Sequence, residues 1–220
     1  MLSLETVQPY YSNDDIVHGF DHIERVLALA NTIAEKENAN WEIVRAAVLL
    51  HDAQLIHLRS PEKEIIKNQR LLHQEDSAEL AREILNREGW AEKRIEEVIH
   101  CIRSHRFRNS PERPSTLEAK VLFDADKLDA IGAVGIARAI AYAAQHGKTF
   151  YTPPSEQFCK TGILEAGEQH SAYHEYLYKL VKLIECMFTP TARQMAQERQ
   201  EFMIHFFNQL KQDCELVNIH

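Results

Sequence analysis

Apolar residues recur every three or four positions along most of this chain, which is the spacing of one buried helix face. The clearest stripe runs from Ile23 to Ala34, and a second runs from Ile95 to Ile102. No segment shows convincing period-two alternation, and there is no internal repeat. The pattern therefore predicts an all-α protein.

Several residues mark expected helix ends. Asn40 is suited to cap a helix that runs to Leu49 and is apolar almost all round, so this helix should be central. Ser77 precedes another apolar stripe, which Gly89 should stop. Thr116 should open a further helix.

The C-terminal third carries two long helical patterns, at roughly 168–188 and 190–212, and Pro190 suits the first turn of the second. We expect one compact domain over residues 1–220, with a core of about 15–150 on which the helices at 168–212 pack. The segments expected to be loops are about 55–62, 106–115 and 147–166. The last is long for a compact domain, which suggests a lid or a loop on the substrate side.

The doublet His51-Asp52 ends the apolar run Ala46–Leu50, where a carboxylate beside an imidazole is costly to bury without a partner. A divalent cation suits both groups. Two further residues set in helical apolar patterns, His22 and Asp126, would complete a site. Taken singly, His22 could be a core histidine held by one hydrogen bond, and Asp126 a buried cap or the partner of a basic residue.

Two histidines and two carboxylates leave coordination positions for water on an ion that prefers five or six ligands. Mn²⁺, Fe²⁺, Co²⁺ and Ni²⁺ fit this description, and Zn²⁺ and Mg²⁺ remain compatible. Open positions are typical of a catalytic metal site rather than a closed structural one.

Composition narrows the function classes. The chain is 45% hydrophobic and 26% charged, ordinary values for a globular protein, and its net charge of -8 argues against nucleic-acid polymers and anionic membranes as partners. The four cysteines have no CxxC spacing, so a zinc finger or disulfide framework has little support. With no signal-peptide or long apolar pattern, we expect a cytoplasmic protein that does not bind membranes.

The order His22, His51-Asp52, Asp126 resembles the H…HD…D pattern of the HD-domain superfamily of metal-dependent phosphohydrolases. The resemblance spans about residues 15–210 and is closest to the small single-domain bacterial HD hydrolases, a group that includes nucleotide pyrophosphohydrolases of the YpgQ type. Its most specific stretches are HIERVLALANTIAEKE, AAVLLHD, HQEDSAELAREIL, VIHCIRSHRF, LEAKVLFDADKLDAIGAVGIARA and TARQMAQERQEFM. It implies that the four residues are metal ligands, with Asp126 rather than Asp124 or Asp129 as the fourth.

The sequence departs from the family after the doublet. Relatives usually continue as HD-I-G-D, whereas this chain reads His51-Asp52-Ala53-Gln54-Leu55. This departure keeps open a second interpretation, in which the protein is a module that binds metal and nucleotide but hydrolyses little substrate.

Basic residues gather where the helix ending near Ile102 stops. A polyphosphate pocket would use such groups, since guanidinium groups clamp phosphate oxygens in pairs. The alternative is an ordinary basic helix end favoured by the helix dipole. The candidates for substrate binding here are His100, Arg103, His105 and Arg106, with Arg108 beyond them.

Four more residues could contribute. His73 could bind phosphate or a second metal, or be a capping or surface histidine, and Lys127 could reach substrate from the rim. Asp129 could orient a ligand histidine or water, and Asp21 has the simpler interpretation of a helix cap. The expected catalytic groups are Asp52, Asp129 and His105.

Together these features predict a divalent-metal phosphohydrolase. The resemblance implies a small phosphorylated substrate, a nucleotide or related metabolite, with pyrophosphate release from a (deoxy)nucleoside triphosphate as the sharper expectation. Hydrolysis of another phosphate monoester or diester is the alternative chemistry. A homodimer is compatible with the sequence.

Overall fold

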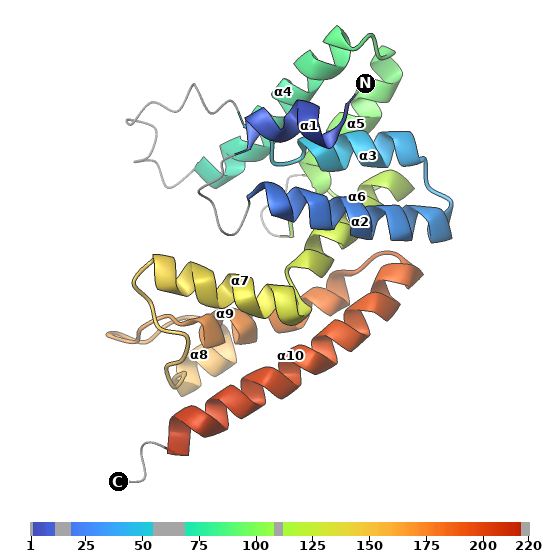
Figure 1. Cartoon of the computed structure of the whole chain (residues 1–220). Helices are drawn as coiled ribbons and strands as arrows, with labels where there is room; N and C mark the ends of the chain where they lie inside the picture. Colours follow the sequence, from blue (N-terminus) through green and yellow to red (C-terminus); the bar gives the residue numbers. More distant parts are fainter. Residues whose placement is uncertain (1, 12–18, 55–68, 108–111, 217–220) are drawn as a thin grey trace. The chain divides into compact units, whose positions relative to one another are not determined.

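The computed structural model describes residues 2–11, 19–54, 69–107 and 112–216, and the predicted all-α fold is confirmed in these ranges, which contain no β-strand (Figure 1). Two short 3-10 helices, η1 (Gln8–Tyr10) and η4 (Leu180–Cys186), accompany the α-helices. The α-helices are α1 (Leu4–Val7), α2 (Phe20–Glu37), α3 (Trp41–Leu50), α4 (Gln69–Arg87), α5 (Glu92–Ser104), α6 (Leu117–Asp129), α7 (Gly132–Gln145), α8 (Glu156–Thr161), α9 (Ala172–Tyr178) and α10 (Pro190–Leu216).

The chain divides into two compact units. Unit 1 consists of Met1–Asp126 with Phe188–Ala192, and unit 2 of Lys127–Met187 with Arg193–His220. The expectation of one domain over 1–220 stays a prediction.

Helix α3 forms the centre of unit 1, as its nearly uniform apolar sequence predicts, and packs against α2 and α5 (Figure 1). Its start is set by Asn40, whose side-chain oxygen accepts hydrogen bonds from the backbone N–H groups of Glu42 and Ile43 at 3.2 and 3.4 Å. Every residue from Ala46 to Leu50 is buried, so the helix carries His51 into the interior, and the half-buried Asp52 follows directly.

The helix that carries the apolar stripe after Ser77 begins before that residue. Helix α4 starts earlier, at Gln69, and Ser77 lies in its interior with its hydroxyl donating to the Ala53 carbonyl at 2.9 Å. Gly89, with φ +76°, follows the end of α4 as predicted. The expected loop at 55–62 lies outside the described residues, and so does part of the loop at 106–115.

In unit 2 the expected helix at 168–188 is divided into α9 and η4. The Ser171 side chain caps α9 at the His174 N–H, and the Glu168 carboxylate accepts backbone hydrogen bonds from Ser155 and Glu165. Residues 168–171 are thus engaged in tertiary hydrogen bonds that a continuous helix would not allow. The second C-terminal helix does begin at Pro190.

Aromatic packing joins α9 to α10 within unit 2. Tyr176 stacks on Phe207 with ring centroids 4.2 Å apart, and Phe207 is completely buried. The segment 147–166, expected to be a loop, contains the short helix α8, and its role as a lid stays a prediction. In the described part of the chain, no helix combines the length and apolar character that crossing a membrane requires.

Candidate metal centre

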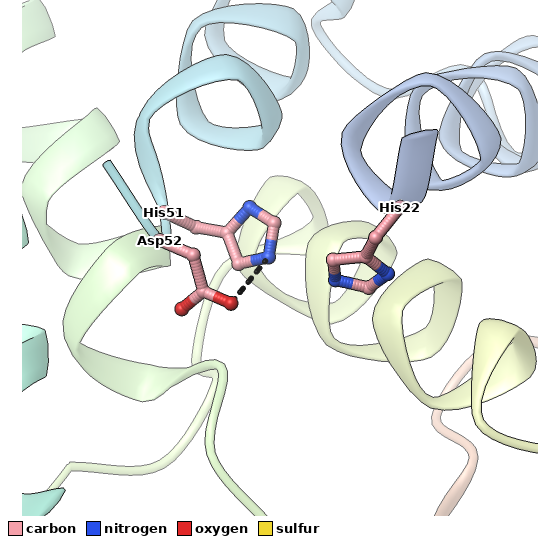
Figure 2. A group of neighbouring side chains, drawn as sticks. All are labelled: His22, His51 and Asp52. Atoms are coloured by element: carbon pink, nitrogen blue, oxygen red, sulfur yellow. Dashed lines mark ion pairs between the residues drawn. The ribbon is translucent and has the colours of Figure 1, made fainter. Parts of the chain in front are cut away.

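Three helices supply the four predicted ligands, and the structure gathers three of these residues into one group. His22 lies in the first turn of α2, His51 is the C-cap residue of α3 with Asp52 directly after it, and Asp126 lies near the end of α6. One ligand atom from each of His22, His51 and Asp52 lies within 4.8 Å of the others. Figure 2 shows Asp52 beside His51, and the rings of His22 and His51 are edge-on to each other with centroids 5.7 Å apart. Asp126 lies beside one member of this group, because its Oδ1 is 3.5 Å from His22 Nε2.

The ring of His51 is held in one orientation. Its Nδ1 is 2.8 Å from the Val48 carbonyl oxygen, which can only accept, so Nδ1 must carry the proton and Nε2 the lone pair. Nε2 is fully buried and has no hydrogen-bond partner among the described residues; the Asp52 carboxylate is 3.6 Å away. A buried acceptor without a donor costs free energy, and a cation would remove that cost.

The donor set fits a divalent cation. It combines two imidazoles with two carboxylates, and the histidines are buried while Asp126 and Asp52 are 15% and 29% exposed. The carboxylates thus lie on the side that water and substrate can reach. Such a mixed nitrogen and oxygen set suits borderline ions and leaves positions open.

His105 belongs to the same cluster. It is the C-cap residue of α5, and its Nδ1 donates to the Ile102 carbonyl at 2.6 Å, the same bond that orients His51. Its ring is edge-on to that of His51 with centroids 5.1 Å apart, and its Nε2 is 3.8 Å from Asp52 Oδ1. His105, which was expected to bind substrate, therefore lies beside the predicted ligands.

Sequence reasoning missed Tyr11. Its buried hydroxyl donates to the Leu49 carbonyl at 2.8 Å. Burial, with the nearby charge of Asp52, raises the pKa of Tyr11 well above its ordinary value, so the phenol keeps its proton. Nothing in the spacing around Tyr10-Tyr11 indicated this contact, which joins residues 38 positions apart.

Asp124, two residues before Asp126, has a different role. Its buried carboxylate accepts hydrogen bonds from the backbone N–H groups of Phe188 and Thr189 at 2.8 and 2.7 Å, and from the Thr189 hydroxyl at 2.7 Å. The Thr189 hydroxyl also accepts from the Ala192 N–H at the start of α10. Asp124 therefore anchors the 188–192 segment in unit 1.

The basic residues at the end of α5 already contact acidic groups. Arg103 forms a two-pronged pair with Glu75, with both N–O distances 2.9 Å. His100 pairs with Glu112 through Nδ1, and its Nε2 accepts from the Ser115 N–H at 3.1 Å. Arg106 is half-buried, and Arg108 lies outside the described residues. Substrate binding by His100, Arg103 and Arg106 stays a prediction.

The remaining predicted site residues have other contacts, belong to unit 2 or are only partly described. His73 lies in α4, but its side chain is outside the described part. Lys127 and Asp129 belong to unit 2, where the buried Asp129 carboxylate pairs with Arg138 at 2.7 Å. Asp21 is not the cap of α2, since Gly19 holds that position; Asp21 pairs with Arg25.

Comparison with known families now gives the class of protein. The family model of the HD domain matches residues 19–131, which include the three helices that supply the predicted ligands. This chain belongs to the HD domain family. Its members bind divalent metals, which agrees with the histidine and aspartate cluster described above.

Particular relatives resemble the chain over almost its full length. The uncharacterized protein YpgQ of Bacillus subtilis is 35% identical over 210 residues, 94% of this chain and 89% of the relative. The crystal structure of B. subtilis YpgQ in complex with ADP matches with a TM-score of 0.67 and 34% identity, covering 96% of this chain and 97% of the other. An HD-superfamily hydrolase of Bacillus thuringiensis matches with a TM-score of 0.69 and 26% identity over 96% and 94% of the two chains. These likenesses support a metal-dependent phosphohydrolase.

Proposed function

We propose that this protein is a divalent-metal-dependent phosphohydrolase that acts on a nucleotide, releasing pyrophosphate from a (deoxy)nucleoside triphosphate. The observation that carries the proposal is the cluster of His22, His51 and Asp52, whose ligand atoms lie within 4.8 Å of one another around a buried imidazole lone pair. His22, His51, Asp52 and Asp126 would hold the cation. When bound, the cation would lower the pKa of water and neutralise phosphoryl oxygens.

His105 would act on the substrate side of this cluster. Because its Nδ1 donates to Ile102, the neutral ring presents Nε2 as an acceptor toward the partly exposed Asp52. There it can accept a hydrogen bond from the attacking water and set its direction. Asp52 would both hold the metal and face this water.

A nucleotide is the substrate class with most support. The relative YpgQ has been crystallised with ADP, and this chain resembles that structure over nearly all of both chains. Arg103 is the last residue but one of α5, where exchange of its Glu75 contact for a phosphate would keep two guanidinium nitrogens engaged. The alternative of a low-turnover binding module rests on the altered sequence after Asp52.

The test is a panel of nucleoside mono-, di- and triphosphates and general phosphoesters, assayed with the metal-free protein and with Mn²⁺, Co²⁺, Ni²⁺, Mg²⁺ or Zn²⁺. Products are separated as phosphate or pyrophosphate. We expect metal-dependent release of pyrophosphate from one or more triphosphates. Release of phosphate alone would favour the alternative chemistry, and tight nucleotide binding without any product would favour the binding module.

Two variants make the assay specific. His51→Ala removes a proposed ligand, and His205→Ala removes an exposed histidine of α10 as the matched control. Activity that survives in His51→Ala would come from a contaminant or from another site.

A further inference from the structure

The end of a helix leaves carbonyl groups without helical partners, and the end of α3 satisfies them in an unusual way. The Val48 carbonyl accepts from the His51 ring, and the Leu50 carbonyl accepts from the Ala53 N–H at 3.2 Å. The carbonyl between them, that of Leu49, accepts from the Tyr11 hydroxyl at 2.8 Å. The chain around the predicted ligands thus depends on a side chain that precedes α2.

The backbone of Asp52 also lies beside the Tyr11 hydroxyl. One phenol therefore contacts the backbone on both sides of His51, at Leu49 and at Asp52. The contact continues along the chain, because the Gln54 N–H donates to the Tyr10 carbonyl at 3.0 Å. At the far end of the turn, the Ser77 hydroxyl holds the Ala53 carbonyl.

Tyr11 contacts α2 as well. Its ring lies 5.8 Å from that of Phe20, the first residue of α2 and two positions before His22. The side chain is only 5% exposed, so it is held by packing as well as by its hydroxyl. It is therefore placed to couple the start of α2 to the end of α3, the two elements that supply both histidines.

We propose that Tyr11 is a positioning residue for the metal centre, with its hydroxyl fixing the backbone around His51-Asp52 while Ser77 holds the other end of the same turn. The inference rests on the proposed function. It adds a residue that lies before the HD segment, which begins at residue 19. It also offers a physical reason why the sequence after Asp52 can differ from that of relatives, since the turn is held by contacts to its backbone.

The experiment compares wild type with Tyr11→Phe, which removes the hydroxyl and keeps the ring. The affinity for Mn²⁺ is measured by calorimetry, and kcat and KM are measured with the best substrate found. The midpoint of unfolding is measured on the protein without metal. Tyr151→Phe is the matched control, because it removes a hydroxyl that donates to Glu215 at 2.9 Å within unit 2. We expect Tyr11→Phe to bind Mn²⁺ about tenfold more weakly and to lose kcat with little change in KM, because outer contacts of metal ligands have effects of roughly this size.

The outcomes separate this inference from the proposed function. If wild type binds none of Mn²⁺, Co²⁺, Ni²⁺, Mg²⁺ and Zn²⁺, both are overturned. If wild type binds Mn²⁺ and Tyr11→Phe keeps its affinity and kcat while only the unfolding midpoint falls, as in Tyr151→Phe, then Tyr11 is structural and the inference alone fails. Should Tyr11→Phe not fold, Ser77→Ala loosens the same turn: weaker Mn²⁺ binding supports the inference, and unchanged binding overturns it.

Discussion

Each unit of the molecule buries a histidine beside a carboxylate, and the two arrangements differ in how their hydrogen bonds are completed. In unit 2, His174 is fully buried, its Nδ1 lies 2.8 Å from the Ser171 hydroxyl, and its Nε2 lies 3.1 Å from Glu168. In unit 1, the equally buried His51 has one nitrogen bonded and the other without a hydrogen-bond partner among the described residues.

The carboxylates differ in the same way. Burial alone would raise the pKa of Glu168, but hydrogen bonds from the backbone of Ser155 and Glu165, with His174, lower it to about 2. Asp52 and Asp126 are more exposed and stand beside several imidazoles. A cluster with all its bonds internal stabilises a fold, whereas one with an unbonded lone pair is prepared for a ligand.

The largest expected effect is that of His51→Ala. Loss of a direct ligand should weaken Mn²⁺ binding by more than about 100-fold, since even outer contacts account for 10- to 100-fold, and should abolish hydrolysis. Calorimetry and the nucleotide assay measure both. Near-normal metal affinity in this variant would contradict the comparison between the two histidines, because the unbonded Nε2 of His51 would then not bind the metal.

His105→Ala should leave the metal in place and slow hydrolysis. Loss of the acceptor that directs the attacking water, at about 2–3 kcal/mol in the transition state, corresponds to a rate loss of roughly 30- to 150-fold. The measurement is kcat/KM beside the Mn²⁺ affinity of the same sample. A large loss of affinity would instead make His105 a ligand, and an unchanged rate would remove it from the mechanism.

His174→Ala tests the histidine cluster of unit 2, which we expect to be structural. Removing this ring leaves the buried Ser171 hydroxyl and the Glu168 carboxylate with fewer partners, which should lower the free energy of unfolding by about 1–3 kcal/mol. Mn²⁺ affinity should equal that of wild type. Urea unfolding and calorimetry test both statements, and weakened metal binding would contradict the purely structural role.

Acid should act on unit 2 through Glu168. Because folding lowers the pKa of this carboxyl from 4.5 to about 2, its stabilising contribution is fully present above pH 4.5 and is lost as pH falls toward 2. Urea unfolding at several pH values between 5 and 2 should therefore show a steeper loss of stability in wild type than in Glu168→Gln. Parallel curves for the two proteins would show that the hydrogen bonds to Glu168 do not favour its charged form.

Periodicity and local chemistry were enough to predict the helical fold, the Asn40 cap and the start of α10 at Pro190, because these depend on residues within a few positions of each other. The same reasoning drew attention to His22, His51 and Asp52, since buried polar groups in apolar stripes need partners. The resemblance to the HD hydrolases singled out Asp126 among the neighbouring aspartates. It failed at 168–188, where Glu168 and Ser171 interrupt a helical pattern with bonds to segments that no periodicity could identify.

The tertiary structure alone decided which polar residues meet. Asp124 and Asp126 look alike in sequence, but the backbone of Phe188 and Thr189 engages the first, and His22 faces the second. Arg103 and His105 seemed equivalent at the end of α5, yet one pairs with Glu75 and the other faces Asp52. Tyr11 gave no signal, because a hydroxyl bonded to a backbone carbonyl 38 residues away depends on the path of the chain and leaves no pattern in the sequence.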